Sequence, residues 1–181
     1  AALKRINDEF PSYFRRPRTM FRQAVLEMKT EPELPQSMIS LVSDPGTSIQ
    51  RREELISEII QYYSRLRSPA ITDERVSTEL KRSDLPELVR SILEYVRAKS
   101  HFDRGQNDEA LAALRGLESK FPPDSGMFVR TMQLLSFVLE RKRDFDGAYE
   151  ARTRYGGSYR PEMGVRVGLE EYREILDLSD R

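Results

Sequence analysis

Apolar residues recur along this chain at helical spacing rather than in strand-like alternation. The clearest case follows Ser48, where one face of a predicted helix carries Leu55, Ile56, Ile59, Ile60, Tyr63 and Leu66. Ser48 is the expected N-cap of this helix, and Ser68-Pro69 is expected to stop it. Shorter or weaker patterns predict helices over 18–29, 72–81 and 146–155, and a final helix marked by Val165, Leu169, Tyr172 and Leu176. The run MISLV, residues 38–42, fits either a helical turn or a strand.

The apolar pattern is widest after Asp84, which we expect to cap a helix beginning at Leu85-Pro86-Glu87. That helix has one stripe of Leu85, Leu88, Val89, Ile92, Leu93 and Val96, and beside it a second of Tyr95, Ala98 and Phe102. A helix that is apolar on two adjacent faces lies between neighbours. The segment after Ser125 shows a similarly wide apolar face, with Phe128, Met132, Leu135, Phe137, Val138 and Leu139.

Nothing in the pattern requires a strand, so we predict an all-α fold of about seven to nine helices. Short connections favour stacked antiparallel hairpins. Composition and pattern change near Arg82. We therefore distinguish an N-terminal helical region, 1–82, from a hairpin array, 83–181, and expect the two to form one continuous domain.

Two segments repeat the same order of residues, AKSHFDRGQNDEALAAL from Ala98 and SFVLERKRDFDGAYEAR from Ser136. Each has a small residue, a bend, and an acid-rich start leading to alanine. The stretch from Leu85 to Leu178 resembles a tetratricopeptide repeat array. Positions that match the family's small residues at helix crossings are Ala98, Ala110, Ser136 and Ala148, and its bend and terminal proline are matched by Gly105 and Pro122.

The match is partial, because Arg143 replaces the glycine usual at the second bend, and the repeat spacing exceeds the family's period. What the resemblance implies is a surface of helical hairpins that binds a peptide or a helix of another protein.

Charge and composition exclude several other classes. The 30 basic residues balance the 30 acidic ones, so no whole-chain field attracts nucleic acid or an anionic membrane. Cysteine is absent, which removes disulfides and thiolate sites. No apolar run approaches a membrane span. Because the chain starts AALKR without Met, we expect a trimmed N-terminus, and we leave open a cytoplasmic or periplasmic location for a soluble protein.

Residues suited to catalysis or metal binding are few. His101 is the only histidine, and packing or a charge contact at a helix end accounts for it most simply. Acidic clusters at 53–58 and 170–174 have arginines within reach, which favours surface ion pairs. Phosphate-binding and hydrolase motifs are missing. We therefore expect no enzyme activity, no metal and no cofactor.

We expect a non-enzymatic adaptor that binds a protein or peptide partner, with an unspecified oligomeric state. Tyrosines suit such contacts, among them Tyr62 and Tyr63, and the predicted binding residues are Tyr149, Arg152 and Tyr155. The alternative is a module that contacts RNA or DNA through arginines set among aromatic residues: Arg15, Arg16, Arg18 and Arg22. The same segment is also typical of an arm whose aromatic residues pack on a helical body.

Overall fold

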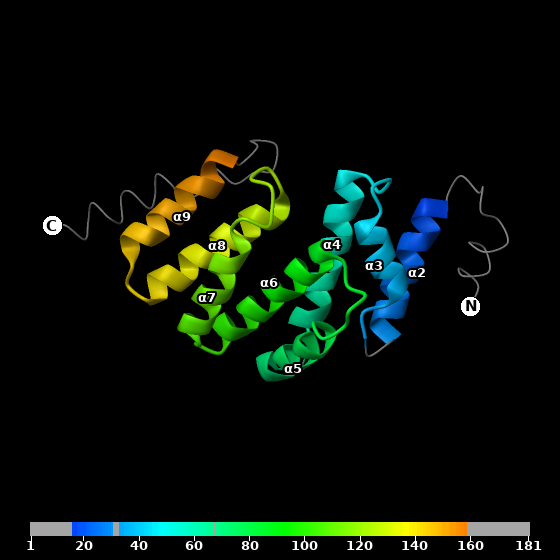
Figure 1. Ribbon diagram of the computed structural model, residues 1–181, viewed down its shortest axis with the longest axis horizontal. Helices are drawn as coiled ribbons and strands as arrows, with labels where there is room; N and C mark the ends of the chain where they lie inside the picture. Colours follow the sequence, from blue (N-terminus) through cyan, green and yellow to red (C-terminus); the bar gives the residue numbers. More distant parts are fainter. Residues whose placement is uncertain (1–15, 31–32, 67, 159–181) are drawn as a thin grey trace. The chain divides into compact units, whose positions relative to one another are not determined.

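The computed structural model describes residues 16–30, 33–66 and 68–158, and all regular structure in these ranges is helical (Figure 1). It comprises α2 (Arg16–Thr30), α3 (Gln36–Ser43), α4 (Ile49–Ser64), α5 (Pro69–Glu79), α6 (Glu87–Asp103), α7 (Asn107–Leu117), α8 (Gly126–Arg141) and α9 (Phe145–Ser158). The all-α prediction is confirmed. The predicted final helix beyond Val165 lies outside the described residues.

The chain divides into two compact units, Ala1–Arg104 and Gly105–Arg181. Helices α2 to α6 belong to the first unit, and α7 to α9 belong to the second. The change of pattern near Arg82 lies within the first unit, at the turn between α5 and α6.

In the first unit, α6 packs against α3, α4 and α5. Both of its predicted stripes supply buried residues: Val89, Ile92, Leu93 and Val96 from one, and Tyr95 and Ala98 from the other. An apolar circumference of this width has to be covered on more than one side. The sequence interpretation of α6 as a helix wedged among neighbours is therefore confirmed within this unit.

Local signals set most helix starts in the first unit. The run MISLV is helical and forms the middle of α3. Ser48 caps α4, as expected, by accepting the Arg51 backbone N–H at 3.3 Å. Ser68 does the same for α5 through the Ile71 N–H at 3.3 Å. Helix α5 therefore begins at Pro69, earlier than the predicted residue 72, because a serine cap followed by proline is a strong start signal.

Asp84 does not cap α6, so that prediction is wrong. Helix α6 begins at Glu87 after Pro86, which provides no side-chain cap. Asp84 instead accepts hydrogen bonds from Arg82, at 3.1 Å from Nε and 2.9 Å from Nη2. This bidentate contact lowers the pKa of the Asp84 carboxyl and raises the pKa of the Arg82 guanidinium.

Arg82 also joins the turn before α6 to the turn before α3. Its Nη1 donates to the buried Glu79 carboxylate at 3.0 Å and to the Leu34 carbonyl at 2.9 Å. The second Glu79 oxygen accepts the Leu34 backbone N–H at 2.6 Å. Arg90 completes the arrangement by donating to the carbonyls of Leu80 and Arg82. We call Glu79, Arg82 and Leu34 the Glu79 clamp.

Tyr63 is fully buried, as its place on the apolar stripe of α4 predicts, and it is therefore not among the tyrosines that can contact a partner. Within residues 16–30, 33–66 and 68–158, its hydroxyl has no hydrogen-bond partner. Burial, followed by the neighbouring Glu79 charge, raises the pKa of this phenol far above its usual value. The ring packs edge-to-face on Tyr62, with centroids 5.1 Å apart, and the Tyr62 hydroxyl accepts a hydrogen bond from Arg75 at 3.1 Å.

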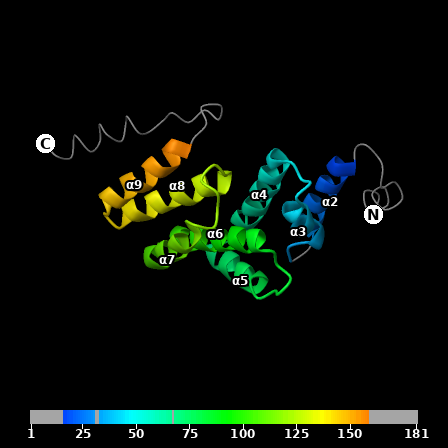
Figure 2. The ribbon, with the colours of Figure 1, turned by 45° about the horizontal axis from the view of Figure 1, so that its top comes forward.

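In the second unit, α8 lies between α7 and α9 (Figures 1 and 2). Helices α8 and α9 form an antiparallel hairpin in which Ser136 and Ala148 are fully buried, as expected for small residues at a crossing. The turn is closed by Asp144, whose backbone N–H donates to Leu139 and whose carboxylate caps α9 through the Gly147 N–H.

The two aligned bends share a left-handed backbone despite their different residues. Gly105 has φ 76° and Arg143 has φ 61°. A non-glycine residue pays a steric cost in this conformation. The second bend therefore keeps the geometry that the glycine provides at the first.

We predict that substitutions at the two bends change the free energy of unfolding in opposite directions. Arg143→Gly should stabilise the protein by about 1 kcal/mol, because glycine removes the left-handed strain. Gly105→Ala should destabilise it by about 1 kcal/mol, and the strain alone is responsible because an added Cβ meets no atom within 4 Å. Urea unfolding measures both changes. Equal signs would contradict this account.

Removing the buried Glu79 carboxylate should destabilise the first unit. Glu79→Ala leaves the Leu34 N–H and one face of Arg82 unpaired, and we expect a loss of about 2–3 kcal/mol, reduced from a fully buried pair because Arg82 is partly exposed. Thermal and urea unfolding provide the measurement. Lys99→Ala, which breaks an exposed pair with Asp103, is the control and should cost under about 1 kcal/mol. Similar losses in both variants would contradict a role for burial.

Tyr63→Phe should stabilise the protein by about 1 kcal/mol, since it removes a buried hydroxyl without a partner and keeps the ring. The raised pKa adds a pH effect. As pH rises above about 10, Tyr63 ionises in the unfolded chain but stays protonated when folded, so the parent loses stability that the variant retains. Unfolding between neutral and alkaline pH tests this. Tyr62→Phe is the control and should destabilise, because it removes the acceptor for Arg75.

Candidate binding face

Helix α8 is buried over most of its circumference and exposes one narrow stripe. The residues on this stripe follow each other at three- or four-residue spacing: Arg130, Gln133, Phe137 and Arg141. We call them the α8 stripe. Phe137 is 40% exposed, which corrects its assignment to the buried apolar face.

Arg152 reaches from α9 to the centre of this stripe. Its guanidinium carbon lies 5.7 Å from the centroid of the Phe137 ring, a cation–π contact, and its Nη2 forms an ion pair with Glu140. The Arg152 side chain is only 16% exposed. The predicted binding residue is therefore held in place by two residues of α8, and it positions one side of the exposed ring.

Tyr155 belongs to the same cluster. The pKa of its phenol is raised above the usual value, mainly because the side chain is partly buried. The Arg152 charge lowers this pKa in part, and the Glu140 charge raises it further. The tyrosine therefore experiences the field of the Arg152–Glu140 pair. Tyr149, the third predicted residue, is half-buried nearer the start of α9. The structure thus places Tyr155 within the electrostatic influence of the Arg152–Glu140 pair, and it adds two residues that the sequence interpretation did not select, Phe137 and Glu140.

A second arginine anchors α9 from another direction. Arg154 pairs with Glu118 at 2.5 Å, and its guanidinium carbon lies 5.8 Å from the Phe128 ring centroid. Together with the packing of α9 on α8, in which Ala148 is fully buried, these contacts fix the helix that carries Arg152 and Tyr155. The face is consequently built on regular helices rather than on a loop.

His101 lies near the C-terminal end of α6, beside Asp73 and Arg104. Its Nε2 lies 3.8 Å from an oxygen of Asp73 on α5, and Arg104 donates to both partners, at 2.9 Å to Asp73 and 3.0 Å to His101 Nδ1. The cluster joins the end of α6 to the start of α5. The three side chains, His101, Asp73 and Arg104, contact one another at the surface of the first unit.

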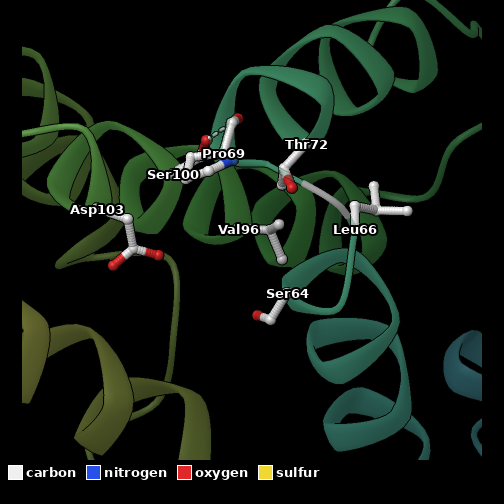
Figure 3. Close-up of a pocket in the computed structure, with 7 residues that line it drawn as sticks. All are labelled: Ser64, Leu66, Pro69, Thr72, Val96, Ser100 and Asp103. Atoms are coloured by element: carbon white, nitrogen blue, oxygen red, sulfur yellow. Dashed lines mark hydrogen bonds between the residues drawn. The ribbon is translucent and has the colours of Figure 1, made fainter.

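A small hollow lies among α4, α5 and α6 (Figure 3). Its walls include Leu66 and Val96, and its hydroxyl groups bond to nearby backbone carbonyls, Ser100 to Pro69 and Thr72 to Tyr63. The volume of about 50 Å³ accommodates a few water molecules at most. This hollow is too small for a substrate of ordinary size.

The acidic clusters behave in part as predicted. Arg51 pairs with Glu54 at 2.6 Å, whereas Arg52 donates to the backbone carbonyls of Val42, Asp44 and Thr47 instead of to a carboxylate. The cluster at 170–174 lies outside the described residues. Among residues 16–30, 33–66 and 68–158, the acidic and histidine side chains form no group of three that could hold a metal ion.

The N-terminal arginines are only partly described. Arg15 lies outside the described residues, and Arg16 and Arg18 are in the first turn of α2, where side chains are outside the description. Arg22 is exposed. Phe21, an aromatic residue of the same segment, has the Arg51 guanidinium carbon 4.6 Å from its ring centroid.

Comparison with known proteins gives no assignment: no family model matches the chain, and no curated protein or solved structure is significantly similar to it. In the described part of the chain, no helix combines the length and the apolar character needed to cross a membrane.

Proposed function

We propose that the protein is a non-enzymatic adaptor that binds a polypeptide partner on the face formed by the α8 stripe, Arg152 and Tyr155. The observation that carries the proposal is an exposed phenylalanine, Phe137, held under an arginine that is itself fixed by Glu140. Aromatic residues and arginine contribute most of the binding energy in protein interfaces. A large apolar ring left in water gains free energy when a partner covers it.

Preorganisation supports the same function. Arg152 and Phe137 are ordered by the hairpin before any partner arrives, so the protein's side of the interface loses little conformational entropy on binding. The resemblance of residues 85–178 to tetratricopeptide repeats, which rests on the sequence, implies the same class of function. Both arguments favour recognition of a peptide or helix over turnover of a small molecule.

Site-specific photo-crosslinking tests the proposal. We expect a photoreactive phenylalanine at position 137 to capture one or a few polypeptides from an extract of the native source. The same probe at Ile49, which is 79% exposed on α4 of the other unit, is the matched control and should capture none of them. Mass spectrometry identifies the products, and nuclease treatment should leave them intact.

Arg152→Ala provides a second variant, because it should reduce crosslinking from position 137 without unfolding the chain, as checked by circular dichroism. Equal capture from positions 137 and 49, or products removed by nuclease, would contradict the proposed function.

A further inference from the structure

We propose that the chain's own C-terminal segment, residues 159–181, docks on this face as a helix and closes it until a partner displaces the segment. The inference rests on the proposed function, because it describes how that same face is regulated. It follows from exposed aromatic rings on one side of the α8–α9 hairpin, from the direction in which the chain leaves α9, and from the apolar spacing within the segment.

The exposed aromatic rings lie on one side of the hairpin. Arg152 contacts Phe137 of α8, so this side of α9 and the α8 stripe border the same face. Phe145 and Tyr149 precede Arg152 at helical spacing, which places all three on one side of α9. Phe145 is 50% exposed and Phe137 is 40% exposed. Two large apolar rings on one face of regular helices are therefore partly open to water, which is typical of a surface that another segment covers.

Helix α7 occupies the other side of the hairpin. Arg154 follows Arg152 by two residues and so points about 200° away from it around the axis of α9. It pairs with Glu118, next to the end of α7, and lies over the Phe128 ring. Helix α7 also packs on α8. Among the described helices, the hairpin is therefore covered on its Arg154 side, and the side with the exposed rings is left for another segment.

The chain leaves α9 in a position to reach this side. Because α8 and α9 are antiparallel, the end of α9 lies beside the start of α8 (Figure 1). Pro161 opposes a straight continuation of α9, so a helix that forms after it can turn back along α8. Helix α8 has 16 residues and is about 24 Å long. A helical segment from Val165 to Leu176 spans about 16 Å, so it fits within the length of α8.

The segment has the apolar pattern needed to cover the rings. Its apolar residues follow one another at four- or three-residue spacing: Val165, Leu169, Tyr172 and Leu176. This spacing places them on one side of a helix. The covalent link favours this occupant over one from solution, since a linked segment meets the face at a high effective concentration. A partner then binds more weakly, because only the open fraction of chains can accept it.

Photo-crosslinking within the purified full chain tests the docking. A photoreactive phenylalanine at position 137 should form its main adduct with residues 159–181, as mapped by mass spectrometry of the digested chain. The same probe at the exposed Arg115 of α7 is the control and should form no adduct with this segment. In a dilute mixture of isotopically light and heavy chains, the adduct should join parts of one chain.

Two outcomes of this experiment would overturn the inference. An adduct that joins a light chain to a heavy chain would show that a second copy occupies the face. The absence of any adduct between position 137 and residues 159–181 would show that the segment does not dock there.

Paired variants identify the side of the segment that docks. Leu169→Asp with Leu176→Asp should abolish the adduct, because docking would bury two unpaired carboxylates. The matched control, Val167→Asp with Leu178→Asp, makes the same changes on the opposite side of the predicted helix and should leave the adduct unchanged. Equal losses in both variants would contradict docking through this stripe. Circular dichroism confirms that each variant is folded.

Capture from an extract separates this inference from the proposed function. With the probe at position 137, Leu169→Asp with Leu176→Asp should raise the yield of captured polypeptides by roughly threefold or more, since more chains are open. Unchanged capture despite a lost internal adduct would overturn the regulatory role. If the open variant captures no polypeptide while the parent forms the internal adduct, the adaptor proposal fails and the docking of the segment stands.

Discussion

The structure depends on the need to cover two helices that are apolar around most of their circumference. Helix α6 buries residues from both of its stripes among α3, α4 and α5, and α8 buries its apolar residues between α7 and α9. A helix of this kind cannot be stable with one partner, since its second face would remain in water. Each compact unit therefore forms around one such helix. Among the described helices, α7 and α9 leave one narrow side of α8 uncovered, and that side carries the candidate binding face.

Apolar packing alone leaves the turns free to shift, and polar contacts remove that freedom in the first unit. Glu79 accepts the Leu34 N–H and pairs with Arg82, which also holds the Leu34 carbonyl. A buried carboxylate is costly unless it is fully paired, so only one placement of these turns is favourable. The Glu79–Arg82 pair therefore matters less for the free energy it contributes than for the single arrangement of the two turns that it favours. The hydroxyl of Tyr63 shows the contrasting case, a polar group buried nearby without a partner.

Much of this fold could be predicted from the sequence because its signals are local. Helical spacing identified the helices, and Ser48 was recognised as a cap because a serine before an apolar-periodic run is a local pattern. The errors involve contacts distant in sequence or choices between local partners. Asp84 looked like a cap, yet Arg82 competes for its carboxylate more effectively than the backbone of α6 does. Leu34 and Glu79 meet only after the chain folds, so no spacing rule could have predicted the clamp.

The candidate site was predictable in part for the same reason. Arg152 and Tyr155 could be selected as arginine and tyrosine on one helix, but the sequence does not show that Arg152 pairs with Glu140 of α8. Phe137 was misassigned although the sequence contained the relevant signal. The positions 131, 134, 135 and 138 are all buried and define one face, and residue 137 lies outside it. The prediction grouped Phe137 with the apolar residues beside it in sequence and did not consider its angular position around the helix axis.

The contacts of Arg152 have a role beyond stability. The Arg152–Glu140 ion pair is mostly buried, so the cost of removing both charges from water offsets much of its contribution to the free energy of unfolding. Its geometric effect is larger, because it holds a guanidinium over one side of Phe137 and leaves the remainder of the ring exposed. If Arg152 were free to rotate, a partner would have to order both side chains on binding. The hairpin has already ordered them during folding, so the face can recognise a partner through only a few residues.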